Sequence, residues 1–172
     1  GNVNKKRKEI YTRVLKGHIA VNKFNLKRNT LGSHVDNVAR KYLKEIGLDY
    51  NHGTGHGVGH FLNVHENPPN ISKSSKCKFF EGQIMSNEPG FYLKNNFGIR
   101  LENLMYVEKN NGKMQFKPLT LAPFDKDMIE IKYLHKHEIR WINDYHHDVY
   151  DKLFYSMNKK ERILLDKYCS PI

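Results

Sequence analysis

The chain has 172 residues, of which 38% are hydrophobic and 27% are charged, and its formal net charge is +11. This length suits one domain, and the composition is typical of a water-soluble globular protein rather than a disordered chain. No apolar run approaches the roughly 18 residues that a membrane helix needs, and the basic N-terminus lacks a signal-peptide core. We therefore expect a cytoplasmic protein with no membrane partner.

The positive charge raises the alternative of a nucleic-acid partner. The lysines, however, are scattered from Lys5 to Lys167, which favours a solvated surface, so we expect no nucleic-acid partner. Cys77 and Cys169 are too far apart in the sequence to form a zinc knuckle or a redox motif and are expected to be reduced thiols.

Two helices are predicted at the start of the chain. Residues 5–22 carry Ile10, Val14 and Val21 at helical spacing. The second helix is expected to be capped by the side chain of Ser33 and to stop at Gly47. Its apolar stripe consists of Val35, Val38, Ala39, Tyr42 and Ile46.

The middle of the chain has a different pattern. Glycine occupies every second position from 53 to 59, which excludes a stable helix and indicates a close approach to the backbone. Short β-strands are predicted at residues 83–86, 98–108 and 115–121, and Asn111-Gly112 predicts a hairpin turn between the last two.

Helical patterns return at residues 137–157 and 156–168. Helices that flank a small antiparallel sheet predict the α+β fold class.

Four of the ten histidines lie between residues 51 and 65, among the glycines: His52, His56, His60 and His65. A single histidine in a loop is usually just exposed, but the glycines remove the bulk that would keep a metal or substrate away. The zinc-protease pattern His-Glu-x-x-His is excluded, because no glutamate follows His52 and the glycines would not hold a helix.

Three carboxylate or guanidinium side chains follow in β-type segments. Glu88 precedes Pro89-Gly90, and Arg100 and Glu102 have even spacing, which predicts that they share one strand face. Taken alone, Glu88 could be a turn residue, and Arg100 and Glu102 could form simple ion pairs.

Taken together, the segments His-Gly-Thr-Gly-His-Gly-Val-Gly (52–59), Asn-Glu-Pro-Gly-Phe-Tyr (87–92) and Gly-Ile-Arg-Leu-Glu-Asn (98–103) resemble X-Pro aminopeptidases. The resemblance covers nearly the whole chain in the same order. It implies that residues 1–172 are the C-terminal portion of a pita-bread (creatinase/aminopeptidase-like) catalytic domain, with residues 123–172 as a C-terminal helical extension.

By this resemblance, His56 and Glu88 bind metal and Glu102 bridges two metals, while His52, His65 and Arg100 line the substrate side and are assigned catalytic roles. The implied cofactors are two divalent ions, with manganese expected first and zinc or cobalt as alternatives. The implied reaction releases the N-terminal residue from peptides that have proline second, by a hydroxide held between the two ions.

The family site also takes two aspartates and a further histidine from upstream, and these have no match here. Asp36 and Asp49 lie where the resemblance places no ligand. We therefore expect that the upstream part of the domain is absent from this chain, that the N-terminal part of the same protein supplies the two aspartates, and that the chain alone is an incomplete enzyme. A homodimer formed through the final helices is also expected. His60 and Asn67 depart from the family pattern at the rim of the pocket.

Two alternatives stay open. The first is a related pita-bread peptidase of the prolidase or methionine aminopeptidase type. The second is a non-catalytic basic binding module of the same fold. The presence of His56, Glu88 and Glu102 within their motifs favours the enzyme, because binding alone does not require metal ligands.

Overall fold

The computed structural model describes residues 3–172, which divide into two compact units. Residues 13–120 form the first, called here the sheet unit, and residues 3–12 with 121–172 form the second, called the helical unit. The boundary falls inside the first helix, α1, which runs from Lys5 to Asn22.

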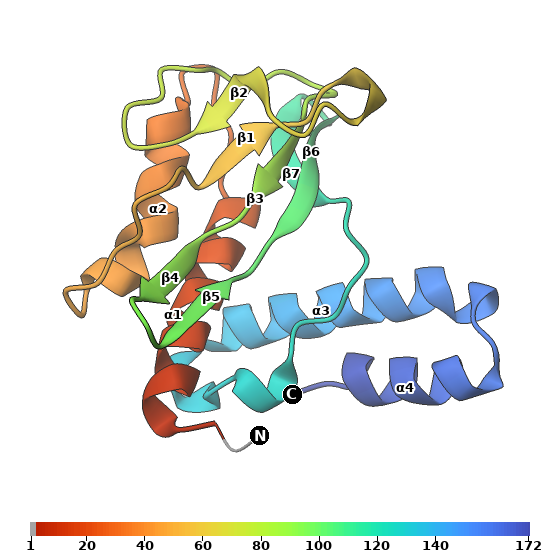
Figure 1. The fold of residues 1–172 in the computed structure, drawn as a ribbon. Coiled ribbons are helices and arrows are strands. Elements are labelled where there is room, and N and C mark those ends of the chain that lie inside the picture. Colours follow the sequence, from red (N-terminus) through yellow and green to blue (C-terminus); the bar gives the residue numbers. More distant parts are fainter. Residues whose placement is uncertain (1–2) are drawn as a thin grey trace. The chain divides into compact units, whose positions relative to one another are not determined.

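The sheet unit holds a five-stranded antiparallel sheet in the order β2-β1-β3-β6-β7 (Figure 1). Its strands are β1 (Gly55–Gly57), β2 (Glu66–Ile71), β3 (Ile84–Asn87), β6 (Asn103–Asn110) and β7 (Lys113–Pro118). A separate two-stranded hairpin consists of β4 (Gly90–Leu93) and β5 (Phe97–Arg100). The α+β prediction is confirmed.

Helices cover one face of the five-stranded sheet. The buried cluster joins Val21 of α1 and Val35 of α2 (Gly32–Lys44) to Met85 of β3 and Met105 of β6. Successive residues of a strand point to opposite faces. Because Met85 faces the helices, its neighbour Ser86 points to the other face.

The predicted cap of α2 by Ser33 is wrong. The helix begins at Gly32 after the N-cap residue Leu31, whose side chain makes no capping hydrogen bond. The amides of Gly32 and Ser33 instead donate to the carbonyl oxygens of Cys77 and Ser75, at 2.9 and 3.1 Å. A neighbouring loop thus satisfies the first two amides of the helix.

The predicted strand at 98–108 is in fact two strands, because β5 ends at Arg100 and β6 begins at Asn103. The hairpin turn at Asn111-Gly112 is confirmed, with φ values of 48° and 77° that suit a turn of this kind. Three strands were missed. These are β1, whose alternating glycines lack a strand pattern, β2, whose polar, proline-containing sequence also lacks one, and β4, which begins at Gly90 within a predicted turn.

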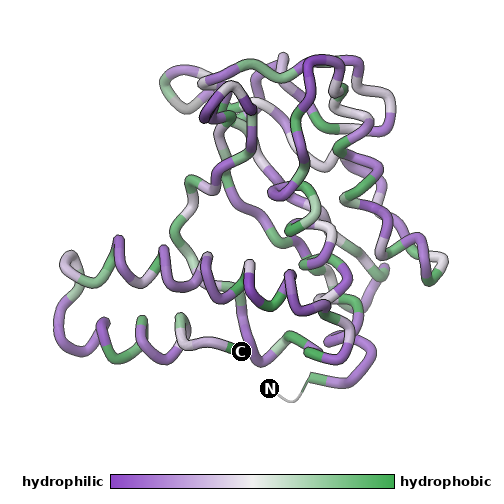
Figure 2. The backbone as a smooth tube through the Cα atoms, turned by 180° about the vertical axis from the view of Figure 1, so that it is seen from behind, coloured by the Kyte–Doolittle hydropathy of each residue, from purple (hydrophilic) through white to green (hydrophobic). Residues whose placement is uncertain are grey.

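The helical unit contains α3 (Lys136–Leu153) and α4 (Lys159–Cys169), and Figure 2 shows hydrophilic and hydrophobic positions alternating along both. Tyr145 of α3 donates to the carbonyl oxygen of Ala122 at 2.9 Å, and the amide of Phe124 donates to His146 Nε2 at 3.0 Å. These bonds attach residues 122–124 to α3. Within residues 3–172 no helix is both long and apolar enough to cross a membrane.

Gly17 of α1 is buried where that helix meets α2, and a Cβ there would clash with the carbonyl oxygen of Ala39. In an ordinary helix interior, glycine to alanine is stabilising by about 0.5–1 kcal/mol.

We predict the opposite sign for Gly17→Ala, because the two helix backbones must move apart. The free energy of unfolding should fall by about 1–3 kcal/mol, measured by urea denaturation. Asn37→Ala, at an exposed position of α2, is the control and should change it little. A stabilised Gly17→Ala protein would contradict the packing described here.

Candidate metal centre

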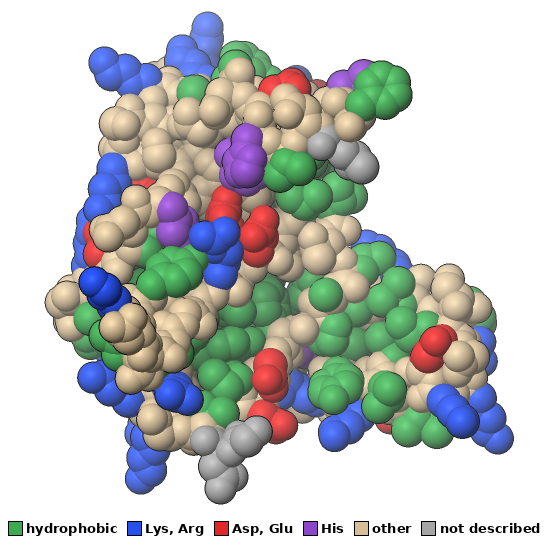
Figure 3. All heavy atoms as spheres, viewed as in Figure 1, with side chains coloured by type: hydrophobic (Ala, Val, Ile, Leu, Met, Phe, Trp, Pro, Cys, Tyr) green, Lys and Arg blue, Asp and Glu red, His purple; other side chains and the backbone are tan. Residues whose placement is uncertain are grey.

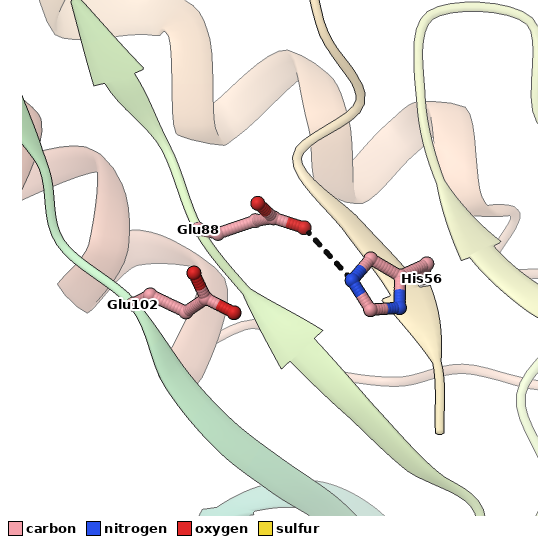
Figure 4. A group of neighbouring side chains, drawn as sticks. All are labelled: His56, Glu88 and Glu102. Atoms are coloured by element: carbon pink, nitrogen blue, oxygen red, sulfur yellow. Dashed lines mark ion pairs between the residues drawn. The ribbon is translucent and has the colours of Figure 1, made fainter. Parts of the chain in front are cut away.

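Three potential metal ligands converge from separate segments: His56 from β1, Glu88 just after β3 and Glu102 between β5 and β6 (Figure 4). One ligand atom from each lies within 4.8 Å of the others. His56 is half-buried, Glu88 is buried and Glu102 is exposed, so the group opens towards solvent on one side.

The ring of His56 is oriented by its own backbone. Nδ1 lies 2.9 Å from the carbonyl oxygen of Gly57, which can only accept, so Nδ1 carries the proton and donates. Nε2 is then left with its lone pair, and it points at Glu88 Oε1 at 3.2 Å. This orientation through the second ring nitrogen is the one that metal-binding histidines use.

Both oxygens of Glu88 have partners. Oε1 accepts from the Ser86 hydroxyl at 3.0 Å and faces His56, while Oε2 lies 3.2 Å from Arg100 Nη1. A buried carboxylate needs such partners, because an unpaired buried charge is strongly destabilising.

Glu102 is held by its neighbour in the chain. His18 of α1 donates from Nδ1 to the carbonyl oxygen of Leu101 at 3.2 Å, and Asn87 donates to the carbonyl oxygen of His18 at 3.0 Å. One turn of α1 therefore anchors the residues adjacent to both Glu88 and Glu102. Glu102 lies outside β5, so the predicted shared strand face with Arg100 is wrong.

The loop that carries His52 is fixed by Arg40, whose side chain is 1% exposed. Its guanidinium pairs with Asp36 at 2.7 Å and Asp49 at 2.8 Å, and it donates to the carbonyl oxygens of Tyr50 and His52, each at 2.6 Å. Burial acts to lower the pKa of Arg40, but the hydrogen bonds that it donates to Asp36 and Asp49, together with nearby charges, outweigh burial and raise the pKa. The guanidinium therefore stays charged.

The same network reaches the metal-ligand group. Asp36 accepts from the Thr54 hydroxyl at 2.7 Å, and the carbonyl oxygen of Thr54 accepts from the amide of Glu88 at 2.8 Å. Asp36, which the resemblance leaves without a role as a ligand, is thus a structural partner of the site.

Tyr92 connects the substrate-side residues. Its hydroxyl accepts from Arg100 Nε at 2.7 Å, and its ring lies 5.4 Å from that of His52, centre to centre. The hydrogen bond to Tyr92 raises the pKa of Arg100, and the charges of Glu88 and Glu102 act in the same direction. The ring of His65 lies 4.2 Å from that of His56.

The structure therefore brings all six predicted site residues into one connected group, and their chemical roles remain predictions. Figure 3 shows acidic, basic and histidine side chains together at the middle of the sheet unit, while other lysines and arginines are spread around it. Sequence reasoning missed Ser86, Tyr92 and Arg40. A signal existed for Tyr92, because it lies within the segment 87–92 that carries the resemblance.

The donor set fits divalent cations. An imidazole nitrogen and carboxylate oxygens suit manganese, zinc or cobalt, and the free lone pair of His56 Nε2 faces the carboxylates. His52 adds an orphaned atom. Its Nδ1 donates to the carbonyl oxygen of Gly53 at 2.7 Å, and its buried Nε2 has no hydrogen-bond partner within the described residues.

Comparisons with known proteins identify similar sequences. The model of metallopeptidase family M24 matches residues 1–109, and that of the C-terminal region of peptidase M24 matches residues 112–172. Xaa-Pro aminopeptidase 1 of Dictyostelium discoideum is 44% identical over 154 residues, which cover 84% of this chain and 25% of the relative. A probable Xaa-Pro aminopeptidase P of Laccaria bicolor is 38% identical, over 100% of this chain and 29% of its own length.

Solved structures show the same likeness. The X-prolyl aminopeptidase of Caenorhabditis elegans, described as a cytosolic enzyme with a dinuclear active site, superimposes with a TM-score of 0.91 and 35% identity. The match covers 99% of this chain and 29% of that one. Prolidase from Pyrococcus furiosus superimposes with a TM-score of 0.64 and 32% identity, over 72% of this chain and 35% of that one. The chain thus spans only about a quarter to a third of these relatives.

The buried side chain of His18 makes the free energy of unfolding depend on pH. Burial lowers the pKa of His18 from 6.5 to about 4, against the weaker effects of its hydrogen bonds. Between these pH values the unfolded chain binds a proton that the folded chain does not, so stability falls as pH drops through this range and is unaffected by His18 above it.

We predict that His18 lowers the free energy of unfolding by up to about 3 kcal/mol when the pH falls from 7 to 4. The measurement is the urea-derived free energy of unfolding as a function of pH, compared with His18→Gln. The difference between the two proteins isolates His18 from other groups, such as buried His146, whose pKa is also lowered to about 4 by burial. Parallel pH curves would contradict the prediction.

Proposed function

Because the chain belongs to metallopeptidase family M24, we propose that it forms the C-terminal part of the active site of an X-Pro aminopeptidase. The observation that carries the proposal is the convergence of His56, Glu88 and Glu102, from three segments, to within 4.8 Å. The proposed reaction is hydrolysis of the bond before a proline in second position, which releases the N-terminal residue.

His56, Glu88 and Glu102 would hold two divalent cations, with Glu102 between them and manganese as the proposed metal. Such a pair of cations activates a water molecule and polarises the substrate carbonyl. The solvent-exposed side chain of Glu102 is suited to contact both cations, whereas buried Glu88 is fixed by its protein partners.

Three ligand side chains are too few to close a dinuclear site, and the matched relatives are three to four times longer than this chain. We propose that the N-terminal part of the same protein supplies two aspartates that complete the set, and that residues 1–172 are the C-terminal part of the catalytic domain, with residues 123–172 as its helical extension.

The remaining residues would act on the substrate. Nε2 of His52 is directed away from its own backbone and is available to hold a proton near the scissile carbonyl. Arg100, tied to Glu88 and Tyr92, would bring positive charge to the same side. His65, stacked on His56 and exposed, would contact the peptide.

An X-Pro aminopeptidase is favoured over a prolidase by the similar sequences, several of which are named Xaa-Pro aminopeptidases. The C. elegans aminopeptidase matches 99% of this chain and the P. furiosus prolidase 72%. We further propose a cytoplasmic location, by analogy with that aminopeptidase. A homodimer is proposed because apolar side chains of α4 are exposed, among them Ile163 and Leu164 at 66% and 53%.

Replacing Glu102 tests the metal role. In the enzyme that contains its upstream part, Glu102→Ala should bind less metal, measured by plasma mass spectrometry, and should lose hydrolysis of a peptide with proline second by more than about 100-fold. Glu81→Ala, at an exposed glutamate away from the site, is the control. Normal turnover with two metals bound would remove Glu102 from the bridging position.

Replacing His65 should separate chemistry from metal binding. His65→Ala is expected to lower kcat by about 100-fold, in the range for loss of a group that handles a proton or charge, while leaving metal content nearly full. His60→Ala, in the same exposed segment, should change kcat much less. A large loss of metal in His65→Ala would show that it acts as a ligand instead.

A further inference from the structure

Ser86 links two of the three metal-ligand side chains. It lies in β3, is fully buried, and its hydroxyl is 3.0 Å from the backbone nitrogen of His56 and 3.0 Å from Glu88 Oε1. His56 and Glu88 are far apart in sequence, so this hydroxyl is a direct connection between their two segments.

The direction of both hydrogen bonds is determined. The backbone N–H of His56 can only donate, so the Ser86 oxygen accepts from it. The hydroxyl hydrogen is then free to donate, and Glu88 Oε1 is the acceptor within reach. Oε1 therefore receives a donor from Ser86 on one side while it faces His56 Nε2, at 3.2 Å, on the other.

The close approach of β1 and β3 makes this link possible. Gly55 lies against the carbonyl oxygen of Ser86, and a Cβ on residue 55 would collide with it. Without that side chain, β1 comes near enough for the amide of the next residue, His56, to reach the Ser86 hydroxyl. The absence of a side chain at Gly55 and the hydroxyl of Ser86 are therefore both needed for this hydrogen bond.

The orientation of the Glu88 carboxylate plane has to be fixed by a hydrogen-bond partner. The last torsion of a glutamate side chain has a broad, roughly two-fold preference, so it does not set the plane by itself. Arg100 contacts Oε2 and is itself half-exposed. Ser86 is the buried, rigid donor that defines where Oε1 points.

We propose that Ser86 is a positioning residue that fixes Glu88 Oε1 relative to His56 and so presets the two ligands for a divalent cation. This inference rests on the proposed function and deepens it, since Ser86 is not one of the three proposed ligands. Loss of the hydroxyl would leave the His56 amide without its acceptor and free the Glu88 carboxylate to turn towards Arg100.

The test compares Ser86→Thr with Ser86→Val in the enzyme that contains its upstream part. Threonine and valine have nearly the same shape, and only threonine keeps the hydroxyl. Mn²⁺ is titrated into the metal-free proteins by calorimetry, and thermal unfolding of the metal-free proteins is recorded alongside. We expect Ser86→Val to bind Mn²⁺ about 10–100-fold more weakly than Ser86→Thr, which should stay close to the wild type.

The outcomes separate failure of the positioning role from failure of the proposed function. Equal Mn²⁺ affinity of the two variants overturns the positioning role, even if Ser86→Val unfolds at a lower temperature. If neither branched side chain is accepted in the buried site, Ser86→Ala compared with the wild type makes the same test without added volume. A wild-type enzyme that binds no Mn²⁺, Zn²⁺ or Co²⁺ overturns the proposed function itself, which distinguishes that failure from the failure of Ser86 alone.

Discussion

The site depends on the placement of one buried carboxylate. Glu88 is 7% exposed, and a charge removed from water in this way is tolerated only when both oxygens have partners. Ser86 supplies one to Oε1 from β3, and Arg100 supplies one to Oε2 from β5. The arrangement of these strands can therefore be understood as the set of positions that keeps Glu88 satisfied.

The helices behind the sheet extend this constraint. His18 of α1 holds the carbonyl oxygen of Leu101 and accepts from Asn87, while Arg40 of α2 holds the loop that carries His52. These polar contacts cross from the helical layer to the sheet segments next to the site. The apolar cluster between the same layers provides the burial, and the polar contacts determine the register in which the chain passes the site.

Much of this could be predicted, for physical reasons that differ by element. Residues 5–22 and the α2 stripe were found because helical periodicity is local, and the six site residues were found because their three motifs are specific in combination. The start of α2 could not be predicted, because its first amides bond to residues 75 and 77, which are distant in sequence. The pair Asp36 and Arg40 was visible at helical spacing. Its burial depends on tertiary packing, and so does its role in holding the loop of His52. Tyr92 was missed as a site residue because Pro89-Gly90 indicates a turn, whereas Gly90 in fact begins β4.

The contact between Arg100 and Glu88 affects how such a centre would acquire its ions. The guanidinium already neutralises Oε2, and its side chain is 44% exposed. A cation that binds at Oε1 would therefore meet a carboxylate whose other oxygen is already paired with a tethered positive group. The arginine could stay at Oε2 near the rim, where an incoming peptide would next meet it.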